Sequence, residues 1–280
     1  MKKILLFFTF LFLMNCQNFG QLTILADLPK DLKEVSGTEI VAKSDFIWMI
    51  NDSGNKPVLF GLNTKGKIIK EIKVRAKNRD WEDLTSDENG NIYIGDFGNN
   101  SNKRKNLSVI IVENNELDED KAEVDIIEFK YPNQNKFPPK NKDKYFDAES
   151  FFYFNKYLYI FTKSRVGGNF GKTTLYKIPA KKGKYTAELV SEFTSCSDNE
   201  CWITSADISI DGKKVVLLSQ KNVLVFTDFI GDKFLSGKVK TINLKYSSQK
   251  ESITFKDKNT VLITDERARN TGGNLYELKI

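Results

Sequence analysis

Histidine is absent from this sequence of 280 residues. That absence excludes Ser-His-Asp and Cys-His catalysis, histidine general bases and the usual zinc sites, because each of them needs an imidazole. Any chemistry must therefore use carboxylates, lysine, tyrosine or a metal ion held by oxygen ligands. Candidate functional residues are accordingly sought among the acids and the side chains near them.

Long apolar runs are also missing, apart from one at the N-terminus. Lys2 and Lys3 precede residues 4–14, which are apolar except for Thr9. A helix that spans a bilayer needs about 20 apolar residues, so this shorter run indicates a secretory signal. We expect residues 1–20 to be a signal peptide and residues 21–280 to form a single exported domain, either periplasmic, attached to the outer membrane or secreted.

Two ways of processing this signal remain open. The segment Leu13-Met14-Asn15-Cys16 resembles a bacterial lipobox, in which Cys16 would be lipidated, although Asn15 stands where Gly, Ala or Ser is usual. The alternative is ordinary cleavage after Gly20, which would leave Gln21 first. Only the lipoprotein form would touch a membrane, and it would do so through its N-terminal lipid alone.

Cysteine is scarce, with three residues in the whole chain. Besides Cys16, the chain has Cys196 and Cys201 close together, and such a pair in an exported protein is typical of a local disulfide. Metal binding is the weaker alternative, because two thiols without histidine make a poor zinc site. We expect a structural bridge that contributes about 2 kcal/mol by restricting the unfolded chain.

A concentrated basic surface is missing as well. The formal net charge is +6, but the lysines are scattered and form no basic stripe with interleaved aromatic residues. This distribution argues against nucleic-acid binding and is typical of a solvated surface that guards sheet edges against aggregation. With 40% hydrophobic and 29% charged residues, the composition is that of an ordinary soluble globular protein.

What the sequence does contain is an internal repeat. From Leu22 onward, short strand-like runs alternate with turn signals, which indicates an all-β fold. Five units each begin with a strand carrying an acid, followed by a turn and an apolar strand. The leading acids are Glu34, Glu82, Glu149, Asp207 and Glu251. The apolar strands end at Asp52, Asp96, Lys163, Gln220 and Asp265, at offsets of 18, 14, 14, 13 and 14 residues.

The units predict a β-propeller with five four-stranded blades. A third strand follows in every unit and a fourth in the first four, whereas the last unit reaches the end of the sequence after three. Residues 22–28, ahead of the first unit, form a spare strand that would complete the last blade and close the ring. Six blades are the alternative, if the long second unit hides two. Residues 114–120 and 133–143 are expected to be solvated loops.

The fold would bring the acids together. First strands of propeller blades line the central channel, so the five leading acids should surround one axis. Further residues are expected on the rim, namely Asp52, Asp80, Asp96, Asp147, Lys163, Arg165, Asp265 and Arg267. Carboxylates so close together cannot all stay ionised without partners. An oxygen-only ligand set favours Ca²⁺ bound by the five leading acids, with Mg²⁺ less suitable.

Plainer roles are also open for these residues. The acids could satisfy backbone N–H groups of neighbouring blades or pair with Arg79, Arg165 and Arg267. Trp48 and Trp81 suit packing between blades. Gly54 and Gly98 are expected in tight turns that need positive φ.

Several segments carry a family resemblance. Glu34-Val35-Ser36-Gly37, Asn51-Asp52-Ser53-Gly54-Asn55, Asp80-Trp81-Glu82-Asp83 and Gly95-Asp96-Phe97-Gly98-Asn99-Asn100 resemble the SdiA-regulated propeller family and are similar to the phytase-like esterase propellers. The resemblance is weaker at Asp147-Ala148-Glu149 and Lys250-Glu251-Ser252. The resemblance implies an exported propeller with a channel suited to calcium. It implies no particular chemistry. It gives phytase activity little support, since a phytate site would want a dense cluster of Lys and Arg beside the acids.

Two functions follow from these expectations. The first is a monomeric, non-catalytic envelope protein that binds a small ligand or a partner protein while the ion rigidifies the channel. The alternative is a calcium-dependent hydrolase of phosphoesters, esters or lactones, with Glu82 or Glu149 as general base. A propeller fold hosts many functions, so the fold by itself cannot choose between them.

Overall fold

The computed structural model describes residues 18–42, 44–269 and 271–280. Cys16 and most of the predicted signal peptide lie outside the described residues. Within the described ranges, no helix has the length and apolar character required to cross a membrane.

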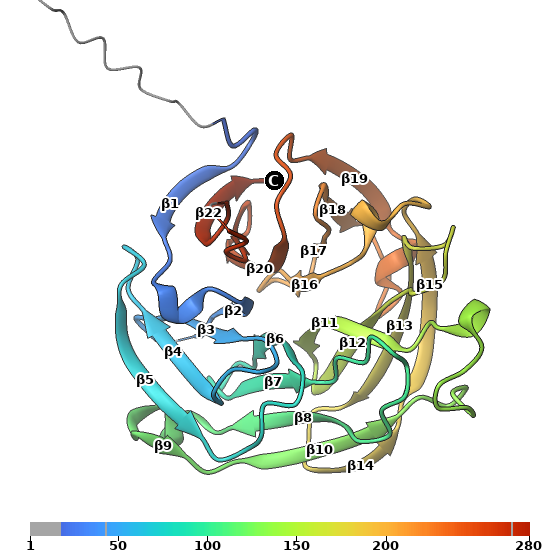
Figure 1. The fold of residues 1–280 in the computed structure, drawn as a ribbon, viewed down its shortest axis with the longest axis horizontal. Coiled ribbons are helices and arrows are strands. Elements are labelled where there is room, and N and C mark those ends of the chain that lie inside the picture. The colour runs from blue at the N-terminus through green and yellow to red at the C-terminus, as the bar shows by residue number, and fades with distance from the viewer. Residues whose placement is uncertain (1–17, 43, 270) are drawn as a thin grey trace, which may run out of the picture.

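Five β-sheets are arranged around a central axis, as Figure 1 shows. The first blade is β2 (Val35–Ile40), β3 (Ile47–Asn51), β4 (Val58–Leu62) and β5 (Ile68–Val74), and the second is β6 (Trp81–Ser86), β7 (Ile92–Asp96), β8 (Leu107–Val112) and β10 (Asp125–Lys130). The third is β11 (Asp147–Phe154), β12 (Tyr157–Lys163), β13 (Lys172–Pro179) and β15 (Glu188–Thr194). The fourth is β16 (Ser205–Ile208), β17 (Val215–Leu218), β18 (Asn222–Thr227) and β19 (Lys238–Asn243). The fifth joins β1 (Thr23–Asp27) to β20 (Lys250–Asp257), β21 (Thr260–Asp265) and β22 (Asn274–Lys279).

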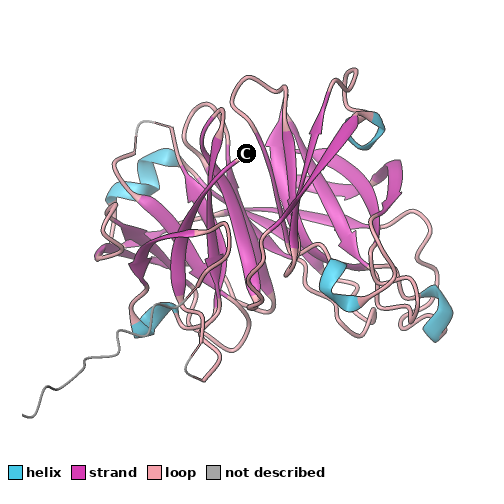
Figure 2. Cartoon of the chain, turned by 90° about the horizontal axis from the view of Figure 1, so that it is seen from above, coloured by secondary structure: helices cyan, strands magenta, loops and turns pink. Residues whose placement is uncertain are grey.

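The predicted five-bladed propeller is confirmed, and the six-bladed alternative is wrong. The described helices are short 3₁₀ turns at the ends of sheets (Figure 2). They are η1 (Lys30–Leu32), η2 (Asn114–Asp118), η3 (Asn141–Asp143), η4 (Asn199–Cys201) and η5 (Phe234–Ser236).

The ring is closed by the predicted N-terminal strand. β1 pairs antiparallel with β22, from Thr23 opposite Glu277 to Asp27 opposite Asn274. Because the last blade therefore contains both a strand from the start of the described chain and three from its end, the ring cannot open without breaking this sheet.

Two blades carry an additional outer strand that comes from further along the chain. β9 (Lys121–Ala122) runs parallel to β5, and β14 (Gly183–Thr186) runs parallel to β10. The prediction of a free solvated loop over residues 114–120 is therefore wrong in part. That segment forms η2, buries Leu117 against the core and leads the chain into β9.

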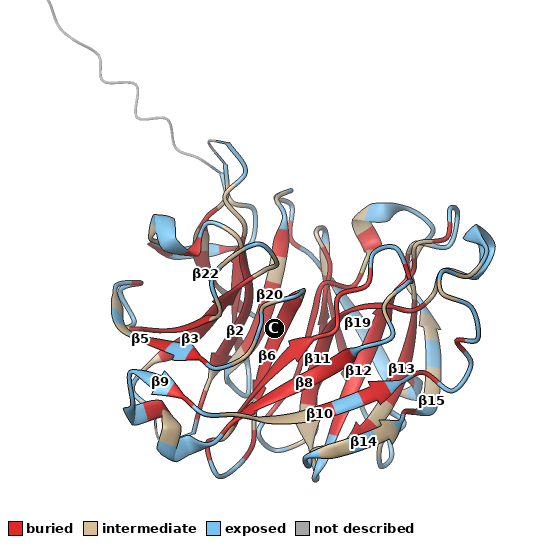
Figure 3. Ribbon diagram, turned by 60° about the horizontal axis from the view of Figure 1, so that its bottom comes forward, coloured by how far each residue is buried: buried red, intermediate tan, exposed pale blue. Residues whose placement is uncertain are grey.

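The core lies between neighbouring blades. Strands β3 and β7 are buried along their whole length, whereas β5 alternates between exposed and buried residues. Figure 3 shows the inner strands β6 and β11 mostly red, which marks buried residues. A second strand flanked by sheets on both sides needs apolar residues on both faces, while an outer strand needs them on one. Trp48 and Trp81 are almost fully buried between the first two blades, as the packing interpretation predicted.

Ring closure gives a first test. Leu28 follows β1 and is 2% exposed in a cluster with Leu262 and Leu275 of the last blade. Leu28→Ala should lower the free energy of unfolding by about 2–4 kcal/mol, because it leaves a cavity at the seam. Leu25→Ala is the matched control, since Leu25 lies in the same segment but is 37% exposed. Urea unfolding measures both, and equal losses would contradict closure through this core.

Candidate functional site

β-Bulges in the first strands present acids at one end of the channel. The ladder shifts between Trp81 and Leu84, between Ala148 and Ser150, and between Lys250 and Ser252. A bulge adds an unpaired residue and re-aims its side chain. Glu82, Glu149 and Glu251 lie in these three bulges, so three of the five leading acids share one structural position.

The tightest group of acids joins the first two blades. Asp52 follows β3, Asp80 precedes β6, and Glu82 lies within β6. One carboxylate oxygen from each of these three residues lies within 4.8 Å of the others, a spacing that could hold a metal ion. Among the described residues, the other group with such spacing contains Cys196 and Cys201, which instead form the predicted disulfide.

The Glu82 carboxylate lacks partners of its own. Glu82 is 9% exposed, and within the described ranges its surroundings supply burial and like charges without a hydrogen-bond donor. Burial, followed by the charges of Glu149 and Asp52, raises its pKa well above the usual range. Burial and Asp52 also raise the pKa of Asp80 to about 6. A buried carboxylate without donors is costly, so this group needs either protons or a cation.

Gly98 forms the wall behind these carboxylates. Gly54 has the predicted positive φ of 80°, but Gly98 does not have a positive φ, so that prediction is wrong for Gly98. Its lack of a side chain matters for space: a Cβ there would lie 1.9 Å from Glu82 Oε1 and 2.5 Å from Asp80 Oδ2. Glycine therefore allows both carboxylates to occupy the position of its missing side chain.

Glu149 is neutralised by two cations from the third blade. It forms ion pairs with Lys163 and with Arg165, whose Nη2 lies 3.0 Å from Glu149 Oε1. Both cations lie over the ring of Trp202, at 5.0 and 4.9 Å from its centroid. Arg165 Nε also lies 2.6 Å from Asp147 Oδ2. Because both Glu149 oxygens are occupied, the structure does not favour Glu149 as a general base.

Two acids of the fifth blade complete the cluster. Burial is the main cause that raises the pKa of Glu251 well above its usual range, with Glu149 adding to it and Lys163 opposing it. Glu266, which follows β21, has a pKa raised to about 7 by burial and by the charges of Asp52 and Glu34. Sequence reasoning missed Glu266. The sequence pattern that could have identified Glu266 is its position next to Asp265, at the end of an apolar strand.

We call Asp52, Asp80, Glu82, Glu149, Glu251 and Glu266 the mouth cluster. Glu34 lies at its outer edge, because the bulge of the first blade falls between Val35 and Gly37 and contains Ser36. The Glu34 side chain is 41% exposed and pairs with Lys33 at 3.3 Å. The hydrogen bond donated by Asn55 Nδ2 at 2.6 Å lowers its pKa. The prediction of Glu34 as a central ligand is therefore not supported by its position.

Asp207 does not join the mouth cluster, so that prediction is wrong. The ladder of the fourth blade runs without a bulge from Ser205 to Ile208, and Asp207 therefore lies further along its strand. It accepts hydrogen bonds from the backbone N–H groups of Phe255 at 2.6 Å and Ile208 at 2.7 Å. This is the plainer role, in which an acid satisfies the backbone of a neighbouring blade.

Asp207 belongs instead to a second group with Glu39 and Asp83, which we call the inner cluster. Asp83 Oδ2 accepts hydrogen bonds from Ser205 Oγ at 3.0 Å and from Phe151 N at 3.4 Å. Glu39 accepts hydrogen bonds from Ser86 and Thr254 hydroxyls. Burial raises the pKa of all three acids. Their carboxylates are satisfied by protein donors.

Two predicted rim residues, Asp96 and Asp265, have structural roles. Asp96 is fully buried and pairs with Arg79 Nη1 at 2.8 Å and Arg104 Nη2 at 3.1 Å. Asp265 is also fully buried and accepts a hydrogen bond from the Tyr276 hydroxyl at 2.8 Å.

Arg267 joins the ends of the ring. Its Nη2 pairs with Asp27 and donates to the carbonyls of Leu28 at 2.9 Å and Gly273 at 3.2 Å. The structure does not support the prediction of Arg267 as a binding residue, because its guanidinium joins the end of β1 to the segment that precedes β22 within the last blade.

No family model and no curated protein matches the sequence. Similar solved structures include virginiamycin B lyase from Staphylococcus aureus, at 13% identity over 90% of this chain and 68% of that chain, with a TM-score of 0.44. They also include a chain of a nidogen/laminin complex, at 10% identity over 83% and 72%, with a TM-score of 0.46. A gluconolactonase from Xanthomonas campestris has 12% identity over 92% and 89%, with a TM-score of 0.49. At these values the likeness carries no argument about function, and the propeller fold rests on the five sheets themselves.

The mouth cluster predicts a pH dependence of stability. Asp80 and Glu266 have folded-state pKa values raised to about 6 and about 7, so folding favours their protonated forms. Without divalent cations, the stability they contribute is present below about pH 4 and is lost as the pH rises through 6 and 7. Asp52→Asn should reduce this loss, because the Asp52 charge raises the pKa of both Asp80 and Glu266. Thermal unfolding in chelator at about pH 5 and pH 8 measures the effect. The same loss of stability between these pH values in the variant and the unchanged protein would contradict the charge coupling within the mouth cluster.

Proposed function

We propose that this chain binds Ca²⁺ at the mouth of its channel through Asp52, Asp80 and Glu82, as part of a ligand-binding propeller. The observation that carries the proposal is the buried Glu82 carboxylate, which lies within 4.8 Å of two other carboxylates. Carboxylate oxygens are the ligands that calcium prefers. The resemblance to the SdiA-regulated and phytase-like propellers supports the same ion.

The charge balance supports a cation. Six acids form the mouth cluster, and its cations Lys163 and Arg165 pair with Glu149 and Asp147. A third cation, Arg104, pairs with Asp96 at 3.1 Å and lies 4.0 Å from Asp80 Oδ2. Asp52, Asp80 and Glu82 are left with excess negative charge in a partly buried place, where like charges repel strongly. A divalent ion would remove that repulsion without protonation.

The surrounding residues fit a role in ligand binding. When bound, the ion would supply a positive centre for an oxygen atom of the ligand. Lys163 and Arg165 lie beside it and are held over the ring of Trp202, which orients these two cations at the mouth of the channel. Gly98, by lacking a side chain, leaves room for the Asp80 and Glu82 carboxylates to come together.

The proposed location is outside the cytoplasm. Residues 1–20 act as an export signal, with Cys16 lipidated or removed. The Cys196–Cys201 bond supports this location, because disulfides persist in oxidising compartments.

Hydrolysis of a phosphoester, ester or lactone is the second candidate function. The observation that favours it is Glu266, whose pKa is raised to about 7 beside the proposed ion site. A carboxylate with a pKa near the working pH is suited to move a proton. Gln249 Nε2 donates to Glu266 Oε2 at 3.2 Å and orients it.

Calcium should stabilise the chelated protein. At about 100 times the dissociation constant, a single ion adds about 2.7 kcal/mol, which raises the melting temperature by about 5 °C or more in a chain of this size. Glu82→Gln should abolish this rise without lowering the stability of the metal-free protein, since burial and the neighbouring acids already favour the neutral, protonated form of Glu82, which Gln resembles in size. Glu119→Gln, at an exposed acid outside the cluster, should respond like the unchanged protein. An unaltered rise in Glu82→Gln would overturn the assignment.

Catalysis is tested separately with nitrophenyl phosphate, nitrophenyl acetate and a simple lactone. The binding function predicts no calcium-dependent turnover above the buffer rate. Calcium-dependent turnover that disappears in Glu266→Gln and persists in Glu119→Gln would replace the first candidate with the second.

A further inference from the structure

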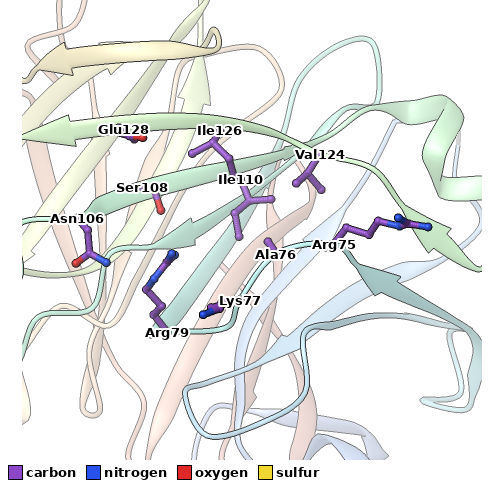
Figure 4. A pocket seen from close by; sticks show the side chains of 10 residues that line it. All are labelled: Arg75, Ala76, Lys77, Arg79, Asn106, Ser108, Ile110, Val124, Ile126 and Glu128. Carbon is purple, nitrogen blue, oxygen red and sulfur yellow. The ribbon is translucent and has the colours of Figure 1, made fainter.

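A cavity of about 420 Å³ lies between the first and second blades and is lined by residues outside the mouth cluster. Figure 4 shows it between the linker that joins β5 to β6 and the outer strands β8 and β10. Its volume falls within the range of small-molecule sites, about 300–1,000 Å³. It arises because the chain leaves the second blade to form β9 against β5 and then returns to β10, bridging the two blades.

The floor of the cavity is apolar. Ile110, Val124 and Ile126 gather at its centre in Figure 4. Ile110 is almost fully buried at the bottom, whereas Val124 and Ile126 are only half-buried. Branched apolar side chains gathered in a cavity favour the apolar body of a ligand.

The linker supplies a basic wall. Arg75, Lys77 and Arg79 line the cavity. Arg75 Nε pairs with Glu123 at 2.9 Å, in an exposed ion pair, and such pairs are weak. Arg79 Nη1 is held more firmly, at 2.8 Å from the buried Asp96. Lys77 is exposed and has no acidic partner among the residues that the structure describes.

The single acid in the lining does not cancel this charge. Glu128 Oε2 pairs with Lys184 Nζ at 2.9 Å. An incoming anion therefore meets Lys77 and Arg75 on one side of an apolar floor. That combination selects a molecule with both a negative head and an apolar body.

We propose that this cavity binds a small anionic amphiphile. Its apolar body lies on Val124 and Ile126, and its carboxylate, sulfonate or phosphate group pairs with Lys77. The site is independent of the proposed calcium function, because none of its lining residues belongs to the mouth cluster and no metal is required.

Two soluble fluorescent probes with the same apolar body test the proposal. Anilinonaphthalene sulfonate carries an anionic group, and phenylnaphthylamine lacks it. In chelator, the full chain should bind one molecule of the sulfonate, on the order of tenfold more tightly than the neutral probe. Added salt should weaken the binding of the sulfonate and leave the binding of the neutral probe unchanged, because salt screens exposed charges.

Matched variants locate the site. Lys77→Glu should weaken sulfonate binding by at least about tenfold while leaving the neutral probe unaffected. Lys240→Glu, the same charge change at an exposed residue of β19 outside the cavity, should alter neither. Ile126→Ser should weaken the binding of both probes. Thermal unfolding verifies that this variant is folded. Equal effects of the two lysine variants, or equal affinity for both probes in the unchanged protein, would overturn the proposal.

Discussion

The pairing of β1 with β22 is the constraint on which the rest of the structure depends. It joins strands from opposite ends of the described chain in one blade, and Arg267 fastens the same seam through Asp27 and Leu28. The first strands surround a common axis only while the ring is closed. The mouth cluster draws its acids from the first, second, third and fifth blades, so it exists only in the closed ring and could not form within any single blade.

The channel acids separate into two clusters that differ in their donors. Asp83 and Asp207 in the inner cluster accept hydrogen bonds from the backbone of neighbouring blades, which makes them part of the framework. Glu82 is equally buried but is surrounded by other carboxylates and by Gly98. Burying a carboxylate without a donor lowers the stability of the fold. A cation bound at the mouth cluster would offset this loss of stability. This difference in donors, and not acidity as such, separates a candidate site from structural acids.

The candidate ion site and the outer cavity share one short piece of chain. The linker from β5 to β6 contributes Arg75 and Lys77 to the cavity, and its next residues lead directly to Asp80. Arg79 Nη1 and the backbone N–H of Asp80 both bind the buried Asp96 carboxylate. Asp96 thus fixes the path by which the chain passes from the outside of the first blade to the mouth of the channel.

The sequence by itself determined the number of blades, the closing strand, the local disulfide and the presence of acids at the start of each unit. These features depend on strand patterns, turns and spacings that lie close together in the chain. Tertiary structure alone decided which acids meet, because a side chain changes face when its strand register shifts by one residue. Bulges in three blades place Glu82, Glu149 and Glu251 together, while the unbroken ladder of the fourth blade sends Asp207 to a different cluster. Glu266 also belongs to the mouth cluster only because the closed ring places it near Asp52 and Glu34 of the first blade.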